Sequence, residues 1–184
     1  MAQNYNYISE IAMSKMSWNL KVRVVRLWHI LDRKKPENSN LIKLIIQDEK
    51  GDRIHATIER AVMRIFKTKI HGMGLYVMKN FVVGPNNLEI KINKHKLKLT
   101  FSHRMSVGEI SDPQFSLNIF NFKPFQHLTN QVEVDENELF DIIGEVIGHG
   151  NVKLYNQGGK TSTFMNLELE DHEYCHGLLS RHTP

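Results

Sequence analysis

The chain has 184 residues, 41% of them hydrophobic, so it can bury one good core, or one complete domain and part of another. Residues 1–105 hold 20 Lys and Arg against 8 Asp and Glu, a net charge of +12, whereas residues 106–184 hold 4 against 12, a net charge of −8. The single cysteine excludes an intramolecular disulfide, and no apolar run is long enough for a membrane span. The basic first part predicts a polyanionic partner, most simply a nucleic acid.

The first predicted elements are strands. Residues 18–30 alternate in part between apolar and polar side chains, which indicates a long first strand. Residues 32–40 are polar and contain a proline, so we expect an exposed loop there. Residues 41–47 resume a strand, and residues 48–52 (DEKGD) are typical of a turn. This order predicts a hairpin.

The third strand and a helix follow the turn. Arg53, His55 and Thr57 alternate with apolar neighbours, so we expect these three on one face and the core on the other. At residues 59–70 the apolar side chains recur at helical spacing, and this is the one convincing helix. Residues 75–83 and 88–101 again have strand patterns. The predicted order is three strands, one helix, then two or three strands.

This order matches the five-stranded Greek-key barrel called the OB-fold, in which the face of the second and third strands and the flanking loops bind oligonucleotides. An SH3-like barrel is the competing small barrel, but it normally lacks a helix at this place. In OB geometry the basic clusters converge on one groove, where single-stranded nucleic acid would lie. The predicted binding residues are Arg23, Arg26, Trp28, Arg33, Lys34, Lys35, Lys43, Arg53, His55, Lys79, Lys91, Lys94 and Lys96.

Several of these aromatic and basic side chains have a second interpretation. Trp28 ends the first strand, and we favour a packing role as a plug of the barrel over base stacking. Phe66, Phe81 and Phe101 have apolar neighbours and are expected in the core. The loop lysines could be solvated charges, but a solvated surface normally intersperses acidic residues, and the first part is short of them.

Five segments carry a resemblance to a known family. They are residues 21–28 (KVRVVRLW), 46–51 (IQDEKG), 54–58 (IHATI), 76–81 (YVMKNF) and 98–101 (KLTF). Over about residues 7–105 the chain resembles the first DNA-binding OB-fold of the replication protein A large subunit, in its plant-type form. The resemblance implies a nuclear protein that binds single-stranded DNA with little sequence preference during replication, repair or recombination, with other proteins of those processes as further partners.

The resemblance continues into the second part. Residues 137–148 and 162–171 resemble the opening strands of the family's second OB-fold, whose later strands have no counterpart. We therefore predict an all-β protein with one helix, a five-stranded OB-fold Greek-key barrel followed by an incomplete second OB-fold with an exposed sheet edge near residues 165–170. The predicted domains are an OB-fold at 1–105, a linker at 106–130, a partial second OB-fold at 131–171 and a disordered tail at 172–184.

Two departures from the family bear on function. The family holds bases on aromatic side chains, but residues 58–60 and 88–92, which match those positions, contain none. Base stacking contributes about 1–3 kcal/mol per base, so electrostatics would supply most of the affinity. The family's zinc-containing assembly domain is also absent, and we do not expect the usual heterotrimer. A protein-interaction module that has lost most nucleic-acid binding is the alternative, and RNA remains a possible ligand.

No motif indicates catalysis or a cofactor. The sequence contains no HExxH or GxSxG motif, and the single cysteine near three tail histidines does not match a zinc pattern. We predict a protein that is not an enzyme and holds no metal. The opposite charges of the two parts also suggest an autoinhibition hypothesis, in which the acidic part folds back onto the basic groove and competes with nucleic acid.

Overall fold

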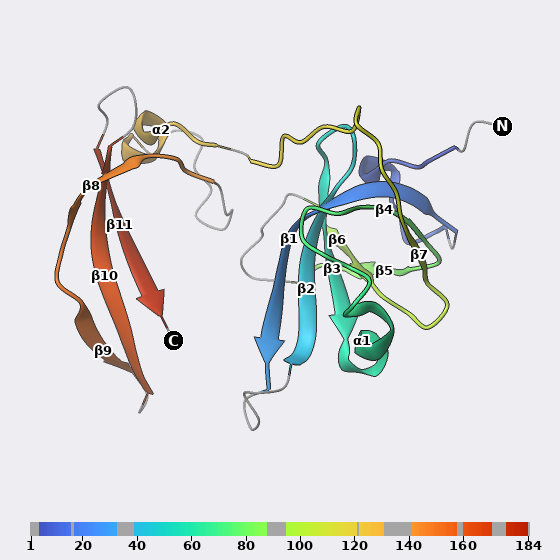
Figure 1. Cartoon of the computed structure of the whole chain (residues 1–184), viewed down its shortest axis with the longest axis horizontal. Helices are drawn as coiled ribbons and strands as arrows, with labels where there is room; N and C mark the ends of the chain where they lie inside the picture. Colours follow the sequence, from blue (N-terminus) through green and yellow to red (C-terminus); the bar gives the residue numbers. More distant parts are fainter. Residues whose placement is uncertain are drawn as a thin grey trace. The chain divides into compact units, whose positions relative to one another are not determined.

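The computed structural model of the chain describes residues 4–15, 17–32, 39–87, 95–120, 122–130, 141–157, 160–170 and 176–183. The described residues form two compact units, one that ends at Ile119 and one that begins at Phe120 (Figure 1). Each unit is described by itself.

The first unit is a curled sheet of seven strands with a helix at one end. Its strands are β1 (Asn19–Leu31), β2 (Ser39–Gln47), β3 (Arg53–Glu59), β4 (Leu75–Lys79), β5 (Val82–Pro85), β6 (Leu97–Thr100) and β7 (Ser106–Glu109). A 3-10 turn, η1 (Ile8–Glu10), precedes the strands, and α1 (Arg60–Phe66) follows β3 directly. The helix and the β2–β3 hairpin therefore lie where the sequence predicts them.

Hydrogen bonding makes the sheet curl. The strand order is β5-β6-β3-β2-β1-β4-β7, and all neighbours are antiparallel except β3 and β6, which are parallel. Strands β4 and β5 are far apart in this order, yet only Asn80 and Phe81 separate them along the chain. Asn80 has a φ of 59°, a left-handed conformation that asparagine tolerates, and it turns the chain between the two strands. The result is the OB-fold architecture.

The core lies on the inner face of the curled sheet. Leu20, Val22 and Val24 are fully buried, which confirms the alternation predicted for the first strand. Phe66 from α1 and Phe101 meet edge to face, with ring centroids 5.0 Å apart. Phe81 is buried as well, so the prediction that all three phenylalanines are core residues is confirmed.

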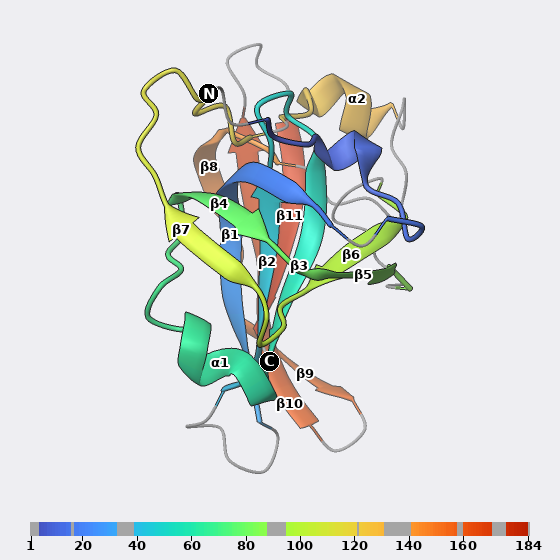
Figure 2. The ribbon, with the colours of Figure 1, turned by 90° about the vertical axis from the view of Figure 1, so that its right-hand side faces the viewer.

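The two ends of the first unit are closed differently. Helix α1 covers one end, and the blue helical turn η1 lies at the other (Figure 2). At the η1 end the buried Asp48 carboxylate accepts hydrogen bonds from the backbone N–H groups of Ile8, Lys50 and Asp52. Burial raises the pKa of Asp48. This carboxylate joins the N-terminal segment to the β2–β3 turn.

The second unit is a smaller antiparallel sheet. It contains α2 (Phe125–Thr129), β8 (Glu145–His149), β9 (Lys153–Gln157), β10 (Lys160–Glu170) and β11 (His176–Thr183). Strand β10 is central, because it pairs with β11 on one side and with β8 and β9 on the other. The prediction of an exposed sheet edge near residues 165–170 is therefore wrong. Residues that we expected in a disordered tail form β11, which pairs with this part of β10.

The predicted fold class is confirmed, with three differences. The first sheet has seven strands where five were predicted. The structure has a second short helix, α2, where one helix was expected. The predicted linker at 106–130 also contains β7, which pairs with β4 in the first sheet. Within the described ranges, no helix combines the length and the apolar character that crossing a membrane requires.

Candidate nucleic-acid interface

Three rows of side chains cross the outer face of β1, β2 and β3. Residues directly opposite each other in an antiparallel pair lie on the same face, so the register defines the rows. The first row is Arg23, Gln47 and Arg53, the second includes Ile45 and His55, and the third is Trp28, Lys43 and Thr57. Lys98 of β6 lies beside His55 in the parallel register. This is the face that binds oligonucleotides in OB-folds.

Residues 112–119, which we call the strap, lie over the first row. Arg23 Nη2 donates to the Phe115 carbonyl at 3.5 Å, Gln47 Nε2 to the Asn118 carbonyl at 2.8 Å, and Arg53 Nη2 to the Ile119 carbonyl at 2.7 Å. Arg53 Nε also donates to Gln47 Oε1 at 2.8 Å. The strap is the yellow segment that follows β7 and returns toward the end of the sheet where the β2–β3 turn lies (Figure 1).

Apolar and ionic contacts hold the two ends of the strap. Ile119 is buried in a small cluster with Val25 and Ile45, against which Trp28 packs. At the other end Lys21 forms an ion pair with Asp112, and the hydrogen bond from Lys21 lowers the pKa of that carboxyl. Phe115 is 4% exposed, and the Lys21 and Arg23 cations lie 5.6 and 5.3 Å from its ring centroid. The strap is therefore packed on the sheet.

His55 occupies the middle of the face. Its side chain is 2% exposed, and its Nε2 atom has no hydrogen-bond partner. Burial, followed by the positive charges of Lys43 and Lys98, lowers the pKa of His55 to about 4. The imidazole is therefore neutral at pH 7, and the prediction that residue 55 lies on the outer face is confirmed although the side chain is not exposed.

The third row is open to solvent. Its residues Trp28, Lys43 and Thr57 are half-buried, as is Lys98 beside the second row, so these side chains line the surface without being enclosed. Trp28 lies on this outer face and not among the core side chains of the inner face, so its interpretation as a barrel plug is wrong. The strand bulge between Val24 and Arg26 explains the placement, because the extra residue changes which side chains of β1 point outward.

Of the other predicted binding residues, the structure describes Arg26, Lys79 and Lys96. Arg26 lies at the bulge, where its Nη1 donates to the Val25 carbonyl at 3.1 Å. Lys79 lies on β4 opposite Asn19 and Ser106, away from β2 and β3. Lys96 is exposed just before β6. Five predicted residues lie outside the described residues: Arg33, Lys34, Lys35, Lys91 and Lys94.

Gln47, Lys98 and the strap also belong to this face, although they are not among the binding residues predicted from the sequence. The sequence does carry a signal for both side chains: Gln47 directly precedes the DEKGD turn and so faces Arg53 across the hairpin, and Lys98 continues the alternation of Lys94 and Lys96. The strap gives a weaker signal, since Phe115 and Ile119 are apolar residues in a segment that otherwise reads as a linker. Its hydrogen bonds to the sheet come from main-chain carbonyls, which every residue carries.

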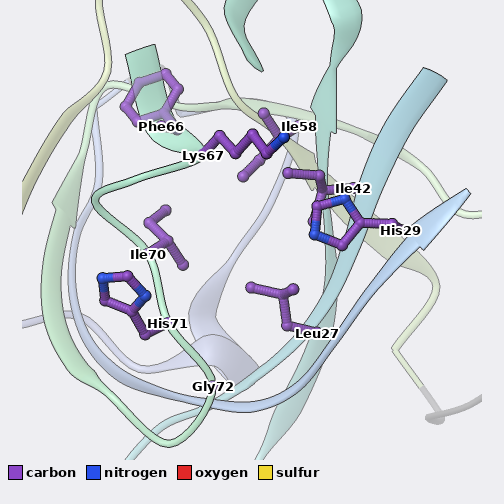
Figure 3. Close-up of a pocket in the computed structure, with 9 residues that line it drawn as sticks. All are labelled: Leu27, His29, Ile42, Ile58, Phe66, Lys67, Ile70, His71 and Gly72. Atoms are coloured by element: carbon purple, nitrogen blue, oxygen red, sulfur yellow. The ribbon is translucent and has the colours of Figure 1, made fainter. Parts of the chain in front are cut away.

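A pocket of about 210 Å³ lies elsewhere on the first unit (Figure 3). Apolar side chains from the inner face and from α1 form its walls, and two imidazoles and an ammonium group lie around it. It is lined by Leu27, His29, Ile42, Ile58, Phe66, Lys67, Ile70, His71 and Gly72. Since Ile42 and Ile58 belong to the inner face, this pocket is separate from the outer face of the sheet. The part of the chain that the structure describes contains no group of three His, Cys, Asp or Glu side chains placed to hold a metal.

Comparison with solved structures identifies the class of fold. The chain is similar to a replication protein A chain from a heterotrimer bound to single-stranded DNA, with a TM-score of 0.64 and 16% identity over 97% of this chain and 41% of that one. It therefore spans less than half of the length of that chain. The DNA-binding domain A of Saccharomyces cerevisiae replication protein A (17% identity, TM-score 0.44) matches 59% of this chain and 95% of its own. Pot1pC of Schizosaccharomyces pombe, in a structure bound to single-stranded DNA (11% identity, TM-score 0.45), matches 61% of this chain and 90% of its own.

The architecture and the first of these matches define an OB-fold protein of replication protein A-like fold. The chain belongs to the family described as "domain of unknown function DUF223", which matches residues 9–131. This region includes the whole sheet of the first unit and the strap. No curated protein matches the chain.

Proposed function

We propose that the chain is a binding module for single-stranded DNA with little sequence preference and without catalytic activity. The observation that carries the proposal is the outer face of β2 and β3, where Lys43 and Lys98 lie beside Trp28, Thr57 and His55. Proteins that bind single strands combine cations, which contact the nucleic-acid backbone, with aromatic rings, on which bases stack. The net charge of +12 on residues 1–105 provides the long-range attraction.

The resemblance to the plant-type replication protein A large subunit supports a more specific role. We infer that the protein acts in the nucleus, in DNA replication, repair or recombination, and that the second unit corresponds to a partial second OB-fold. Zinc-dependent assembly into the usual heterotrimer is not part of this proposal. Because an OB groove admits both nucleic acids, RNA is the first competitor to measure.

The test is fluorescence anisotropy with a labelled oligo-dT of about 20 nucleotides, long enough for one OB site. Lys43→Glu with Lys98→Glu should weaken binding by the full chain at low salt by about tenfold or more, and should reduce the salt slope by about 0.7 for each phosphate that the variant no longer neutralises. Lys69→Glu is the control, because it reverses an exposed charge beyond α1. Equally weakened binding in both proteins would show that the outer face is not the site.

A protein-docking module is the second candidate. Exposed apolar side chains of the second unit favour it, among them Ile143 (67% exposed), Val152 (65%) and Leu154 (73%). This candidate predicts no binding of oligo-dT even at low salt. Such a result would contradict the first proposal and leave docking as the function to pursue.

A further inference from the structure

The strap occupies the positions at which a ligand of the outer face would accept hydrogen bonds. We propose that Arg23, Gln47 and Arg53 form a subsite for the backbone of a single strand, and that residues 112–119 mask this subsite as an intramolecular competitor. The inference rests on the proposed function, because it describes the regulation of the same face. It assigns a role to Gln47 and to the strap, and it restricts the open site to the third row and to Lys98.

The hydrogen bonds show what the subsite recognises. Three neighbouring side chains donate to three carbonyl oxygens of the strap, at 3.5, 2.8 and 2.7 Å. A carbonyl oxygen and a phosphate oxygen accept the same donors, but the phosphate is charged and forms the stronger bond with a guanidinium. Arg23 also donates through Nη1 to the Met73 carbonyl at 2.7 Å, so the strap supplies only the acceptor of its Nη2 group. A phosphodiester backbone could replace the strap and keep these donors satisfied.

The strap is attached in a way that allows it to leave. None of the residues 112–119 belongs to a strand, so its release would break no sheet hydrogen bonds. Two apolar side chains anchor it, Phe115 at 4% and Ile119 at 5% exposure, whereas Leu117 between them is 69% exposed. The ion pair of Asp112 with Lys21 adds a contact that salt weakens.

The masking differs from the autoinhibition hypothesis drawn from charge. That hypothesis places the acidic second part on the basic groove, but the strap contains a single acidic residue, Asp112. Its carbonyl groups and its apolar anchors cover the first row. Masking therefore depends on the packing of Ile119 and responds to salt only through the ion pair.

A matched pair of substitutions tests the proposal in the full chain. Ile119→Asn removes the buried anchor without changing the charge, and Leu117→Asn makes the same change at an exposed position of the same segment. Because the apparent affinity scales with the fraction of protein in the open state, Ile119→Asn should bind labelled oligo-dT of 20 nucleotides about fivefold more tightly. Leu117→Asn should bind like the unsubstituted chain. Circular dichroism and thermal melting would verify that both variants are folded.

A second measurement needs no variant. Amide hydrogen exchange in the unsubstituted chain should become faster over residues 112–119 when oligo-dT is bound, because the displaced strap loses its packing. Slower or unchanged exchange there, with binding intact, would overturn the masking and leave the proposed function standing. The same holds if folded Ile119→Asn binds no more tightly than Leu117→Asn. Failure of every protein to bind oligo-dT at low salt would overturn the proposed function, and the masking with it.

Discussion

The outer face of the first unit has a covered half and an open half, built from the same three strands. In the covered half, Arg23, Gln47 and Arg53 donate to carbonyl groups of the strap. In the open half, Lys43 and Trp28 lie two rows further along the same strands and are half-buried. Charge alone does not distinguish the halves, since both are cationic. The long-range contacts of the strap decide which cations are accessible to a ligand.

His55 lies at the boundary between the halves, and we expect its titration to have the largest effect on stability. Its pKa falls from 6.5 to about 4 on folding, so the unfolded chain binds a proton that the folded chain lacks between these pH values. The free energy of unfolding should therefore rise with pH over this range, and about 3 kcal/mol should be lost as the pH falls from 7 to 4. Urea unfolding at a series of pH values measures this slope.

His55→Gln should remove most of the slope, because glutamine does not titrate. His103→Gln is the control, since His103 is exposed. Asp48, whose pKa is raised by burial, acts in the opposite direction, because its contribution falls as the pH rises above its ordinary pKa. The difference in slope between His55→Gln and His103→Gln therefore measures the contribution of His55 to the pH dependence of the free energy of unfolding. An unchanged slope in His55→Gln would show that the imidazole is not buried and neutral.

A matched pair of truncations compares the halves directly. Arg53→Ala removes the hydrogen bonds to Gln47 Oε1 and to the Ile119 carbonyl of the strap and leaves both acceptors without this donor, so it should cost about 2 kcal/mol of unfolding free energy. Lys43→Ala in the open half should change stability by less than about 0.5 kcal/mol. Denaturant unfolding with equal m-values measures both. Equal costs would contradict the division of the face.

The two tryptophans report on ligand binding in the open half. Trp28 is half-buried on the interface, whereas Trp18 is 5% exposed and its Nε1 donates to the Lys15 carbonyl at 3.0 Å. Stacking of one base on Trp28 is worth roughly 1 kcal/mol or more, so Trp28→Leu should weaken oligo-dT binding several-fold. Fluorescence quenching by oligo-dT should persist in Trp18→Phe and disappear in Trp28→Leu. Quenching that survives in Trp28→Leu would place the ligand elsewhere.

The smallest effect is expected at the ion pair that ends the strap. The hydrogen bond from Lys21 lowers the pKa of Asp112, so its contribution is present above the ordinary pKa of aspartate and is lost as the pH falls. Asp112→Asn should make amide exchange over residues 112–119 slightly faster at pH 7 and low salt. At high salt the difference between the variant and the unsubstituted chain should become smaller, because salt screens this half-buried ion pair in part. A difference that is independent of salt would show that the ion pair does not hold the strap.

The sequence by itself determined the order of the elements in the first unit. Leu20, Val22 and Val24 are buried in turn because a strand buries every second side chain. In the helix after Glu59, buried side chains recur instead every three to four residues. The strand period also placed Arg53, His55 and Thr57 on one face. These features are local, so a window of a few residues contains the information.

Only the tertiary structure decided which part of the face is open. The Arg53–Ile119 hydrogen bond joins residues 66 positions apart, and its acceptor is a main-chain carbonyl that no residue type identifies. The bulge that turns Trp28 outward, and strand β11, which covers the edge of β10, likewise depend on partners remote in sequence. Residue patterns record which side a strand buries, but the masking of a surface depends on what the rest of the chain packs against it.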